Sequence, residues 1–324
     1  MANPDYHQSR WKFLLAAVFA ALLAASCGKR ADPAPKPQAP PPFEFLNAWG
    51  DKGEGPGKLD QPVAFTADIL GNVLFADPGA GFVHKFQSKG TPLLSFEDPR
   101  LHRASGIAVD SGGAIYVADA ERGSVLIFFP DGTFYRARQV AAQPHFTGPL
   151  GISVDITGHL YVPDPAHSRI VKIDPQGRLG KSWTVPKDPK ADERPSAVGT
   201  VKDESVFVAF DKGGRIEKYS SDGAWITSWN AMDNLAGDLH SVAGFAVTDE
   251  FVFALIVSPP QIRVWTIDGQ HKLDADIAEH LATISGPVTA LQIAVTPHAE
   301  LLVFDPSAPR VFRFRIHLEA EEHK

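Results

Sequence analysis

The stretch DSGGAIYVADAERGSVLIFFPDG, residues 110–132, decides the fold of this chain because it holds two short strands and two turns in a pattern that recurs. Asp110 opens a glycine turn into the strand AIYVAD, and a second strand ends in the turn at Gly132. Both strands are rich in β-branched and aromatic residues, which is typical of β-structure. The stretch therefore predicts antiparallel strands joined by tight turns.

Two markers of this unit repeat along the chain. A turn glycine recurs about 45 residues apart, which is a blade-sized period; it occurs at Gly90, Gly132, Gly177, Gly223 and Gly269. A turn followed by a β-rich strand occurs in six copies, at 68–77, 110–119, 155–164, 202–211, 248–257 and 296–305. Between the markers run strands with period-2 alternation. We expect them to begin at Phe82, Ser124, Arg169, Arg215, Gln261 and Arg310.

Each unit predicts four short antiparallel strands. An inner strand such as GISVD (151–155) turns into the second strand, a loop leads to the third, and the glycine turn leads to a fourth such as AWITSWN (224–230). Six units share residues 43–318, about 46 residues each, which is within the range of four-stranded propeller blades. We therefore expect an all-β chain folded as a six-bladed β-propeller.

The last unit predicts how the ring closes. Counting on from Arg310, the sixth turn glycine should stand at 318, where the sequence has Leu318. At the other end FEFLNAW, residues 43–49, is a strand without a hairpin partner, and its Trp49 aligns with Phe96, Trp183 and Trp229 of the fourth strands. We expect strand 43–49 to complete the last blade, because closure removes the free sheet edges. We expect the recurring aromatic residues to pack between blades.

The first three units resemble NHL repeats. The sequences GKLDQPVAFTADILGNVLFADPGAGFVHKF (57–86) and SGIAVDSGGAIYVADAERGSVLIF (105–128) are similar to the NHL pattern, and the resemblance fades in units four to six. The resemblance implies a six-bladed propeller. It implies little about activity, since propellers host many unrelated functions.

The N-terminal residues predict export. Arg10 and Lys12 precede the apolar run 13–25, which as a helix would span about 20 Å and is too short for a bilayer core of about 30 Å. ALLAASC (21–27) resembles a bacterial lipobox, in which a lipid is attached to the cysteine, here Cys27. An ordinary secretory signal, with Cys27 incidental, is the alternative. We favour a signal peptide at 1–26, a lipidated cysteine and proline-rich spacer at 27–42, the propeller at 43–318 and a charged tail at 319–324.

Localisation and partners follow from these features. In lipoproteins a residue other than Asp after the cysteine, here Gly28, implies the outer membrane of Gram-negative bacteria. We therefore expect an exported monomer, held to a membrane through Cys27 and binding a protein or peptide. Cys27 is the single cysteine, so no disulfide forms within the chain. A net charge of −7 makes nucleic acid a poor partner.

Candidate binding residues gather on the face that carries the second-to-third strand loops and the connections between blades. These connections are 50–62, 97–105, 140–150, 184–195, 230–241 and 276–287. The candidates in them are His102, Arg103, His145 and His240, and the candidates at the ends of second strands are Asp77, Asp119, Asp164 and Asp305. The aspartates could pool charge for a cation or basic peptide. We favour a structural role for them, capping their own loops, with pairs from Asp164 to Arg169 and from Asp305 to Arg310.

Two resemblances bear on catalysis. The three histidines resemble in outline the metal site of the peptidyl-hydroxyglycine amidating lyase, but that family sets each histidine in a Pro-His step at the start of an inner strand, where this chain has Ser105, Leu150 and Ala243. Glu54 resembles the glutamate near the start of gluconolactonase-like hydrolases, yet it lies well before the first inner strand of this chain. The inner strands carry almost no convergent polar groups. We expect a non-catalytic binding scaffold without cofactor or metal; the alternative is a divalent-metal-dependent hydrolase or lyase on the loop face.

Overall fold

The computed structural model describes residues 40–79, 81–101, 103–119, 121–139, 151–186, 193–233, 242–257, 260–281 and 291–318. Internal contacts group Pro41–Lys324 into one unit, separate from Met1–Pro40. Within the described residues no helix has the length and apolar character needed to span a membrane. The structural statements below concern the unit from Pro41 onward.

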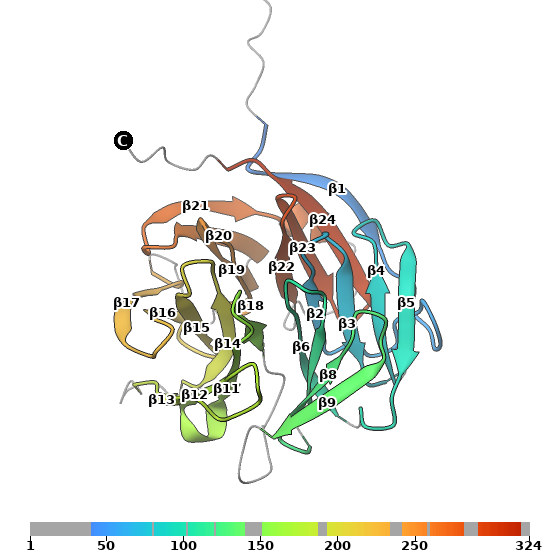
Figure 1. Ribbon diagram of the computed structural model, residues 1–324. Helices are drawn as coiled ribbons and strands as arrows, with labels where there is room; N and C mark the ends of the chain where they lie inside the picture. Colours follow the sequence, from blue (N-terminus) through green and yellow to red (C-terminus); the bar gives the residue numbers. More distant parts are fainter. Residues whose placement is uncertain are drawn as a thin grey trace, which may run out of the picture. The chain divides into compact units, whose positions relative to one another are not determined.

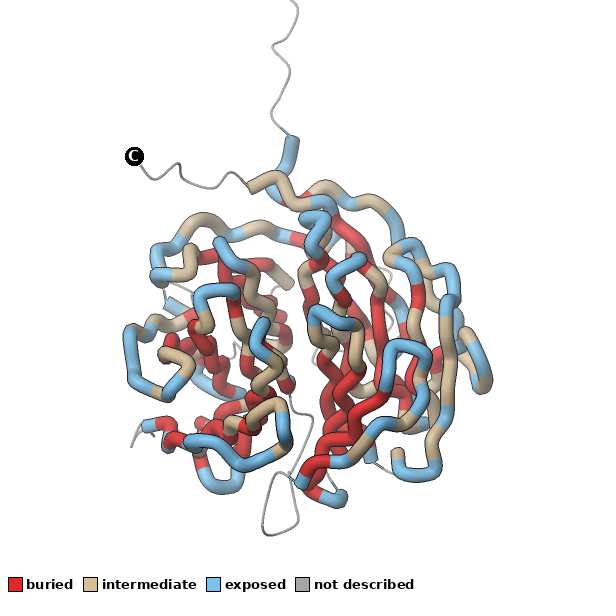
Figure 2. The backbone as a smooth tube through the Cα atoms, viewed as in Figure 1, coloured by how far each residue is buried: buried red, intermediate tan, exposed pale blue. Residues whose placement is uncertain are grey.

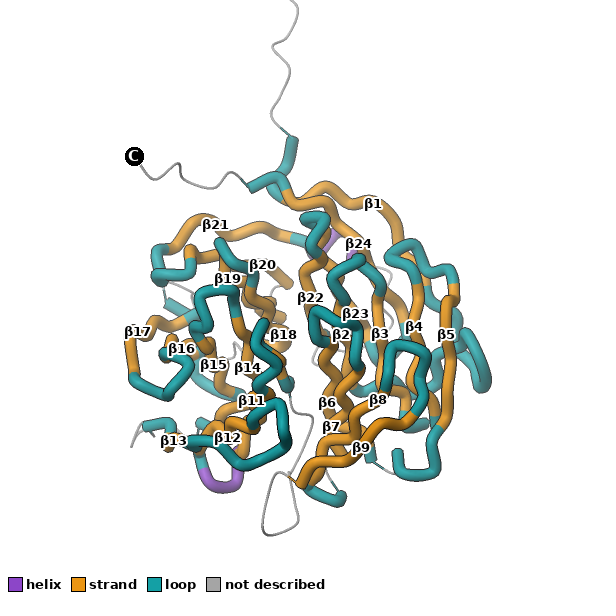
Figure 3. Tube along the Cα trace, viewed as in Figure 1, coloured by secondary structure: helices purple, strands orange, loops and turns teal. Residues whose placement is uncertain are grey.

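The described chain is almost entirely sheet, with six four-stranded antiparallel sheets (Figures 1 and 3). The first three blades are β2 (Ala64–Ala67), β3 (Val73–Asp77), β4 (Phe82–Phe86) and β5 (Pro92–Glu97); β6 (Ala104–Val109), β7 (Ile115–Asp119), β8 (Ser124–Phe128) and β9 (Phe134–Gln139); and β10 (Ser153–Val154), β11 (Leu160–Asp164), β12 (Arg169–Ile173) and β13 (Trp183–Thr184). A 3-10 turn, η1 (Pro165–His167), joins β11 to β12.

The other three blades complete the ring. They are β14 (Pro195–Thr200), β15 (Val206–Phe210), β16 (Arg215–Tyr219) and β17 (Trp225–Asn230); β18 (Val242–Val247), β19 (Phe251–Val257), β20 (Pro260–Thr266) and β21 (His271–Asp276); and β22 (Gln292–Thr296), β23 (Glu300–Asp305), β24 (Arg310–Ile316) and β1 (Phe43–Trp49). A short helix, α2 (Ala278–Leu281), follows β21. The third strands begin where the sequence predicts, except that β20 begins one residue early.

The ring closes through the N-terminal strand, as the sequence predicts. β1 pairs antiparallel with β24, and Phe43 faces Ile316 while Trp49 faces Val311 (Figure 1). The inner strands β2, β6, β10, β14, β18 and β22 contact one another in ring order, and β22 contacts β2. The prediction of a six-bladed propeller sealed in its last blade is confirmed. It places residues from both ends of the propeller in one sheet.

Burial explains why these segments form strands. All five residues of β3, β7, β11 and β15 are buried, because each second strand lies within its sheet and both of its faces are covered by neighbouring blades (Figure 2). Such strands read as continuous apolar runs. Fourth strands lie at the outside of the ring, and the exposure of their residues alternates along the strand, as in β9. The core therefore lies between blades and forms several separate clusters.

The recurring aromatic residues and the turn glycines form one contact, repeated around the ring. Trp49 lies on Gly90 of the next blade, and the same pairing joins Phe96 to Gly132, Trp183 to Gly223 and Trp229 to Gly269. A Cβ atom on any of these glycines would lie within 2.8 Å of the ring, and each glycine has a positive φ. The expectation of inter-blade packing is confirmed. Over Gly177 the side chain of Arg138 occupies the place that an aromatic ring occupies over the four glycines above.

The two ends of the ring differ in their connections. The loop face carries the second-to-third strand loops and the connections between blades. The turn face carries the first-to-second and third-to-fourth strand turns. Because β1 runs from the turn face to the loop face, the chain joins the ring at the turn face, where the Pro42 carbonyl accepts a hydrogen bond from the His317 amide at 2.9 Å.

Candidate functional site

Two of the predicted aspartates on the loop face cap their own loops. Asp119 Oδ1 accepts hydrogen bonds from the amides of Glu121 and Arg122, at 2.9 and 3.1 Å. Asp305 Oδ1 accepts from the Ser307 amide at 2.9 Å and the Ser307 hydroxyl at 2.6 Å. Both carboxylates are buried, and their Oδ2 atoms find no hydrogen-bond partner in the described part of the chain. These groups fix the path of the loop that follows each second strand.

Asp77 holds a different loop from the one expected. Its two oxygens accept hydrogen bonds from the amides of Asp60 and Gln61, at 2.7 and 2.9 Å, so it fixes the connection that enters the first blade. The buried imidazole of His84 lies beside it, with Nε2 4.0 Å from Asp77 Oδ2 and Nδ1 2.9 Å from Ser95 Oγ. Burial lowers the pKa of His84, against the opposing effect of the Asp77 charge.

Asp164 is the aspartate that forms the expected ion pair. Its Oδ2 atom lies 2.8 Å from Nε of Arg169 and 2.9 Å from Nδ1 of His167, which bridges β11, η1 and β12. Arg310 faces Asp305 in the register of β23 and β24, but the contacts of Asp305 are with Ser307. The four candidate aspartates thus use their carboxylates in three ways, each of them within or between loops.

The remaining candidates lie elsewhere. Arg103 is exposed on the loop face, directly before β6. His102, His145 and His240 lie outside the described residues, as does Cys27. Across the residues that are described, no group of three or more His, Cys, Asp or Glu side chains could hold a metal ion.

The fourth blade contains a buried charged network that no pattern in the sequence predicts. Arg215 Nε lies 2.8 Å from Glu193 Oε2, and its terminal nitrogen lies 2.7 Å from Glu217 Oε1. The Tyr219 hydroxyl donates to the other oxygen of Glu217, and burial together with that carboxylate raises the tyrosine pKa. The guanidinium also lies over the Phe210 ring, 3.7 Å from its centroid. The network ties the incoming connection to β16. Nothing local in the sequence pairs Glu193 with Arg215.

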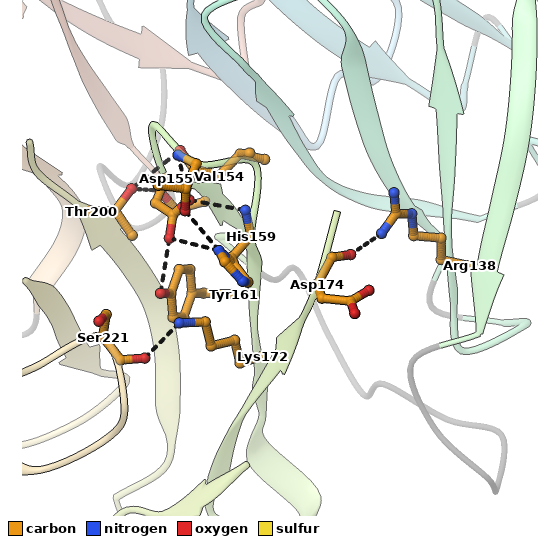
Figure 4. Close-up of polar contacts among 11 residues, drawn as sticks. Arg138, Val154, Asp155, His159, Tyr161, Lys172, Asp174, Thr200 and Ser221 are labelled. Carbon is orange, nitrogen blue, oxygen red and sulfur yellow. Dashed lines mark hydrogen bonds and ion pairs between the residues drawn. The ribbon is translucent and has the colours of Figure 1, made fainter. Parts of the chain in front are cut away.

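Polar contacts also hold the third blade between its neighbours (Figure 4). Arg138 of β9 donates to the carbonyl oxygens of Asp174 and Pro175. Lys172 of β12 donates to the Ser221 carbonyl at 2.8 Å. Burial lowers the pKa of Arg138, and nearby Arg136 acts in the same direction. These contacts compensate for short strands, because β10 and β13 have two residues each.

Around the centre of the ring, polar side chains pair with their neighbours. Ser153 Oγ lies 2.8 Å from Thr200 Oγ1 and so links the third and fourth blades. Gln292 Nε2 donates to the Val63 carbonyl at 2.6 Å across the junction of the sixth and first blades. The other inner-strand side chains are mainly small or apolar, as in β6 and β18. The described polar groups here hold blades together.

Comparisons with known proteins agree with the geometry. Residues 101–128 match the family model of the NHL repeat. No curated protein matches the sequence. Among solved structures, a streptogramin B lyase aligns with a TM-score of 0.59 at 16% identity, covering 84% of this chain and 88% of that one.

Two further structures are similar. Virginiamycin B lyase from Staphylococcus aureus aligns with a TM-score of 0.57 at 13% identity, covering 86% and 90% of the two chains. The Cps50 (Swd1) β-propeller domain of Myceliophteria thermophila aligns with a TM-score of 0.57 at 13% identity, covering 85% and 100%. At these identities the likeness shows the shared propeller fold.

Proposed function

We propose that this NHL-repeat six-bladed propeller is held at a membrane by a lipid on Cys27 and serves as a non-catalytic binding scaffold. Its partner would be a protein, a peptide or a component of the bacterial envelope, bound on the loop face. The proposal combines the confirmed propeller architecture with the export signal and spacer predicted at the N-terminus.

The observation that carries the proposal is the use made of the loop-face carboxylates. Asp77, Asp119, Asp164 and Asp305 each direct at least one carboxylate oxygen to a backbone amide or side chain of the loops around them. These carboxylates fix the geometry of the loops, as a rigid frame for binding loops requires. A catalytic centre instead needs polar groups that converge on one point in a cleft.

The direction in which the chain enters supports a tethered scaffold. β1 begins at the turn face and the loop face lies at its far end. The described chain therefore enters the ring at the end opposite the loops. A tether at Cys27 would leave the loop face open to a partner.

Site-specific crosslinking tests the binding role. A photoreactive amino acid would replace Arg103 or Glu121, both exposed on the loop face, and Ser111 or Asp131, both exposed on the turn face, as matched controls. In native envelopes, we expect the same discrete crosslinked partner from both loop-face positions and from neither control. The same product from both faces, or none from the loop face, would count against the proposal.

Two simpler measurements test the remaining parts. Changing Cys27→Ser should abolish incorporation of labelled fatty acid and move the protein from the membrane fraction to the soluble fraction; unchanged fractionation would exclude the anchor.

Elemental analysis after dialysis tests the non-catalytic role. A stoichiometric divalent metal that is lost when His102, His145 and His240 are replaced would favour the enzyme alternative.

A further inference from the structure

The exposed apolar side chains of the propeller gather at one end. All the large apolar side chains that are exposed in the described residues lie in turn-face turns or in the first half of a fourth strand. They include Leu70, Ile156 and Leu179 in the turns, and Leu93, Tyr135 and Trp225 near the starts of β5, β9 and β17. Leu70 is 69% exposed and Trp225 is 57% exposed. Exposed apolar surface concentrated on one face is typical of interaction sites.

Charge divides this surface into two sectors. The turns of the fourth and fifth blades carry most of the exposed acids, among them Asp203, Asp222, Asp249, Glu250 and Asp268. The turns of the first and third blades carry Lys89 and Arg178, and the sixth blade carries Arg315 next to the entry of the chain; all three are exposed. The apolar side chains lie mostly in the first three blades. We name the turn ends of the sixth, first, second and third blades the apolar sector.

We infer that the apolar sector rests on the surface of a lipid bilayer. This inference relies on the proposed attachment through Cys27 and deepens it. The described chain enters the ring in the sixth blade, at the edge of the sector, and the predicted spacer between Cys27 and Phe43 would reach about 45 Å if fully extended in polyproline conformation. Attachment through such a spacer keeps the propeller at a high effective concentration at the membrane, so weak individual contacts suffice.

The side chains of the sector suit the headgroup boundary. Tyr135 is an aromatic residue with a polar tip, a type that favours the interface between lipid and water, and leucine and isoleucine side chains insert below it. The cations Lys89 and Arg178 would meet lipid phosphates, whereas the acidic turns of the fourth and fifth blades would be repelled from them. The ring would therefore sit tilted, with its loop face directed into the aqueous phase.

Spin-label depth measurements on the full lipidated chain test this orientation. With Cys27 acylated, a cysteine introduced by Leu70→Cys, Leu179→Cys, Glu250→Cys or Glu121→Cys is the only free thiol. The first two probe the apolar sector, the third probes the acidic turns and the fourth is the loop-face control. In vesicles of phosphatidylcholine with some phosphatidylglycerol, labels at 70 and 179 should lie about 5–10 Å below the phosphates. Labels at 121 and 250 should remain in water.

The outcomes separate this inference from the anchor itself. Flotation of the vesicles shows whether the full chain is attached, and Cys27→Ser is its control. If the protein floats but labels at 70 and 179 are as accessible to an aqueous relaxation agent as the label at 121, the inference is wrong while the anchor stands. Strong dipolar coupling between labels at 70 on two molecules would assign the sector to a second copy and would also overturn it.

A second variant keeps the test independent of any single label. Replacing Leu93→Ser together with Leu179→Ser should shift a label at 70 toward water, because neighbouring apolar contacts with the bilayer are lost. Both residues are exposed, so the fold should tolerate the change, which a thermal unfolding curve would verify. An unchanged depth at position 70 would show that the sector does not act as one surface and would contradict the inference.

Discussion

Trp49 Nε1 donates a hydrogen bond to the Ser88 carbonyl oxygen at 2.8 Å, and so ties the N-terminal strand to the glycine turn of the first blade. The same indole packs against the rings of Phe75 and Phe86 in that blade. The strand β1 therefore closes the ring through two separate sets of contacts. β1 completes the sheet of the sixth blade, and its last residue forms the junction with the first blade.

The contact between Trp49 and Gly90 predicts a costly substitution. Gly90 has φ of +93°, and a Cβ atom there would lie 2.6 Å from the indole. We expect Gly90→Ala to lower the free energy of unfolding by about 2–4 kcal/mol, since left-handed strain and overpacking add. Gly81→Ala is the matched control, because Gly81 has φ of +73° with nothing within 4 Å of a Cβ. It should lose only about 1–2 kcal/mol. Equal losses in urea denaturation would refute the packing role.

The closure of the ring predicts that strand 43–49 can be moved. Deleting Phe43–Trp49 should abolish cooperative unfolding, because it exposes the edge of β24 and removes the buried Phe43 ring. Placing FEFLNAW after Leu318 through a Ser-Asp-Gly turn like 221–223 should restore it, since the other five blades have this order. Thermal unfolding monitored by circular dichroism distinguishes the three chains. A deletion variant that melts like the intact protein would show that β1 does not seal the ring.

Local patterns in the sequence are sufficient to predict the fold. The turn glycines and the aromatic residue six positions later lie within one hairpin, so their spacing predicts both the strands and the blade junctions. The same spacing at the second blade leads to Arg138, which is why a cation there replaces an aromatic residue over Gly177. Its partners, the carbonyls of Asp174 and Pro175, belong to the next blade, and no spacing rule indicates them.

Contacts between side chains of unrelated loops could not be predicted in this way. Asp77 matches the repeat position of Asp119, yet it accepts from the amides of Asp60 and Gln61 in the preceding connection, as Asp211 accepts from the Arg194 amide. Glu193 lies in a connection with no repeat pattern, and only the folded chain brings it to Arg215. Strand positions follow from a local period, whereas these pairs depend on the path of irregular loops.

The network around Arg215 predicts a large loss of stability when the cation is removed. Arg215→Ala would leave the buried carboxylates of Glu193 and Glu217 without their shared cation. We expect the free energy of unfolding at neutral pH to fall by about 3 kcal/mol. Arg310→Ala is the control, because Arg310 begins the equivalent strand of the sixth blade and is exposed; it should have little effect. Similar losses in the two variants would mean that the buried network contributes nothing specific.

Asp155 predicts a defined loss of stability in acid. Burial acts to raise its pKa, but hydrogen bonds from Thr157, from the His159 amide and from the Tyr161 hydroxyl outweigh burial and hold the pKa below 3.8. A carboxyl whose pKa is depressed by folding stabilises the protein above its unfolded pKa. That contribution is lost as the pH falls through the folded value. The stabilisation should therefore be complete near pH 6 and decline below about pH 4.

Substitution of Asp155 tests this directly. In Asp155→Asn the buried Tyr161 hydroxyl loses its carboxylate acceptor, so the variant should be less stable by about 1–2 kcal/mol at neutral pH. The difference from the parent protein should shrink as the pH falls below about 4, because the parent then loses the same charge. Tyr161→Phe keeps the charge and the backbone donors to Asp155, so a pH-dependent contribution of the carboxylate should persist in that variant. Urea unfolding at a series of pH values measures all three proteins. A difference between Asp155→Asn and the parent that stays constant from neutral pH into acid would show that ionised Asp155 does not stabilise the blade.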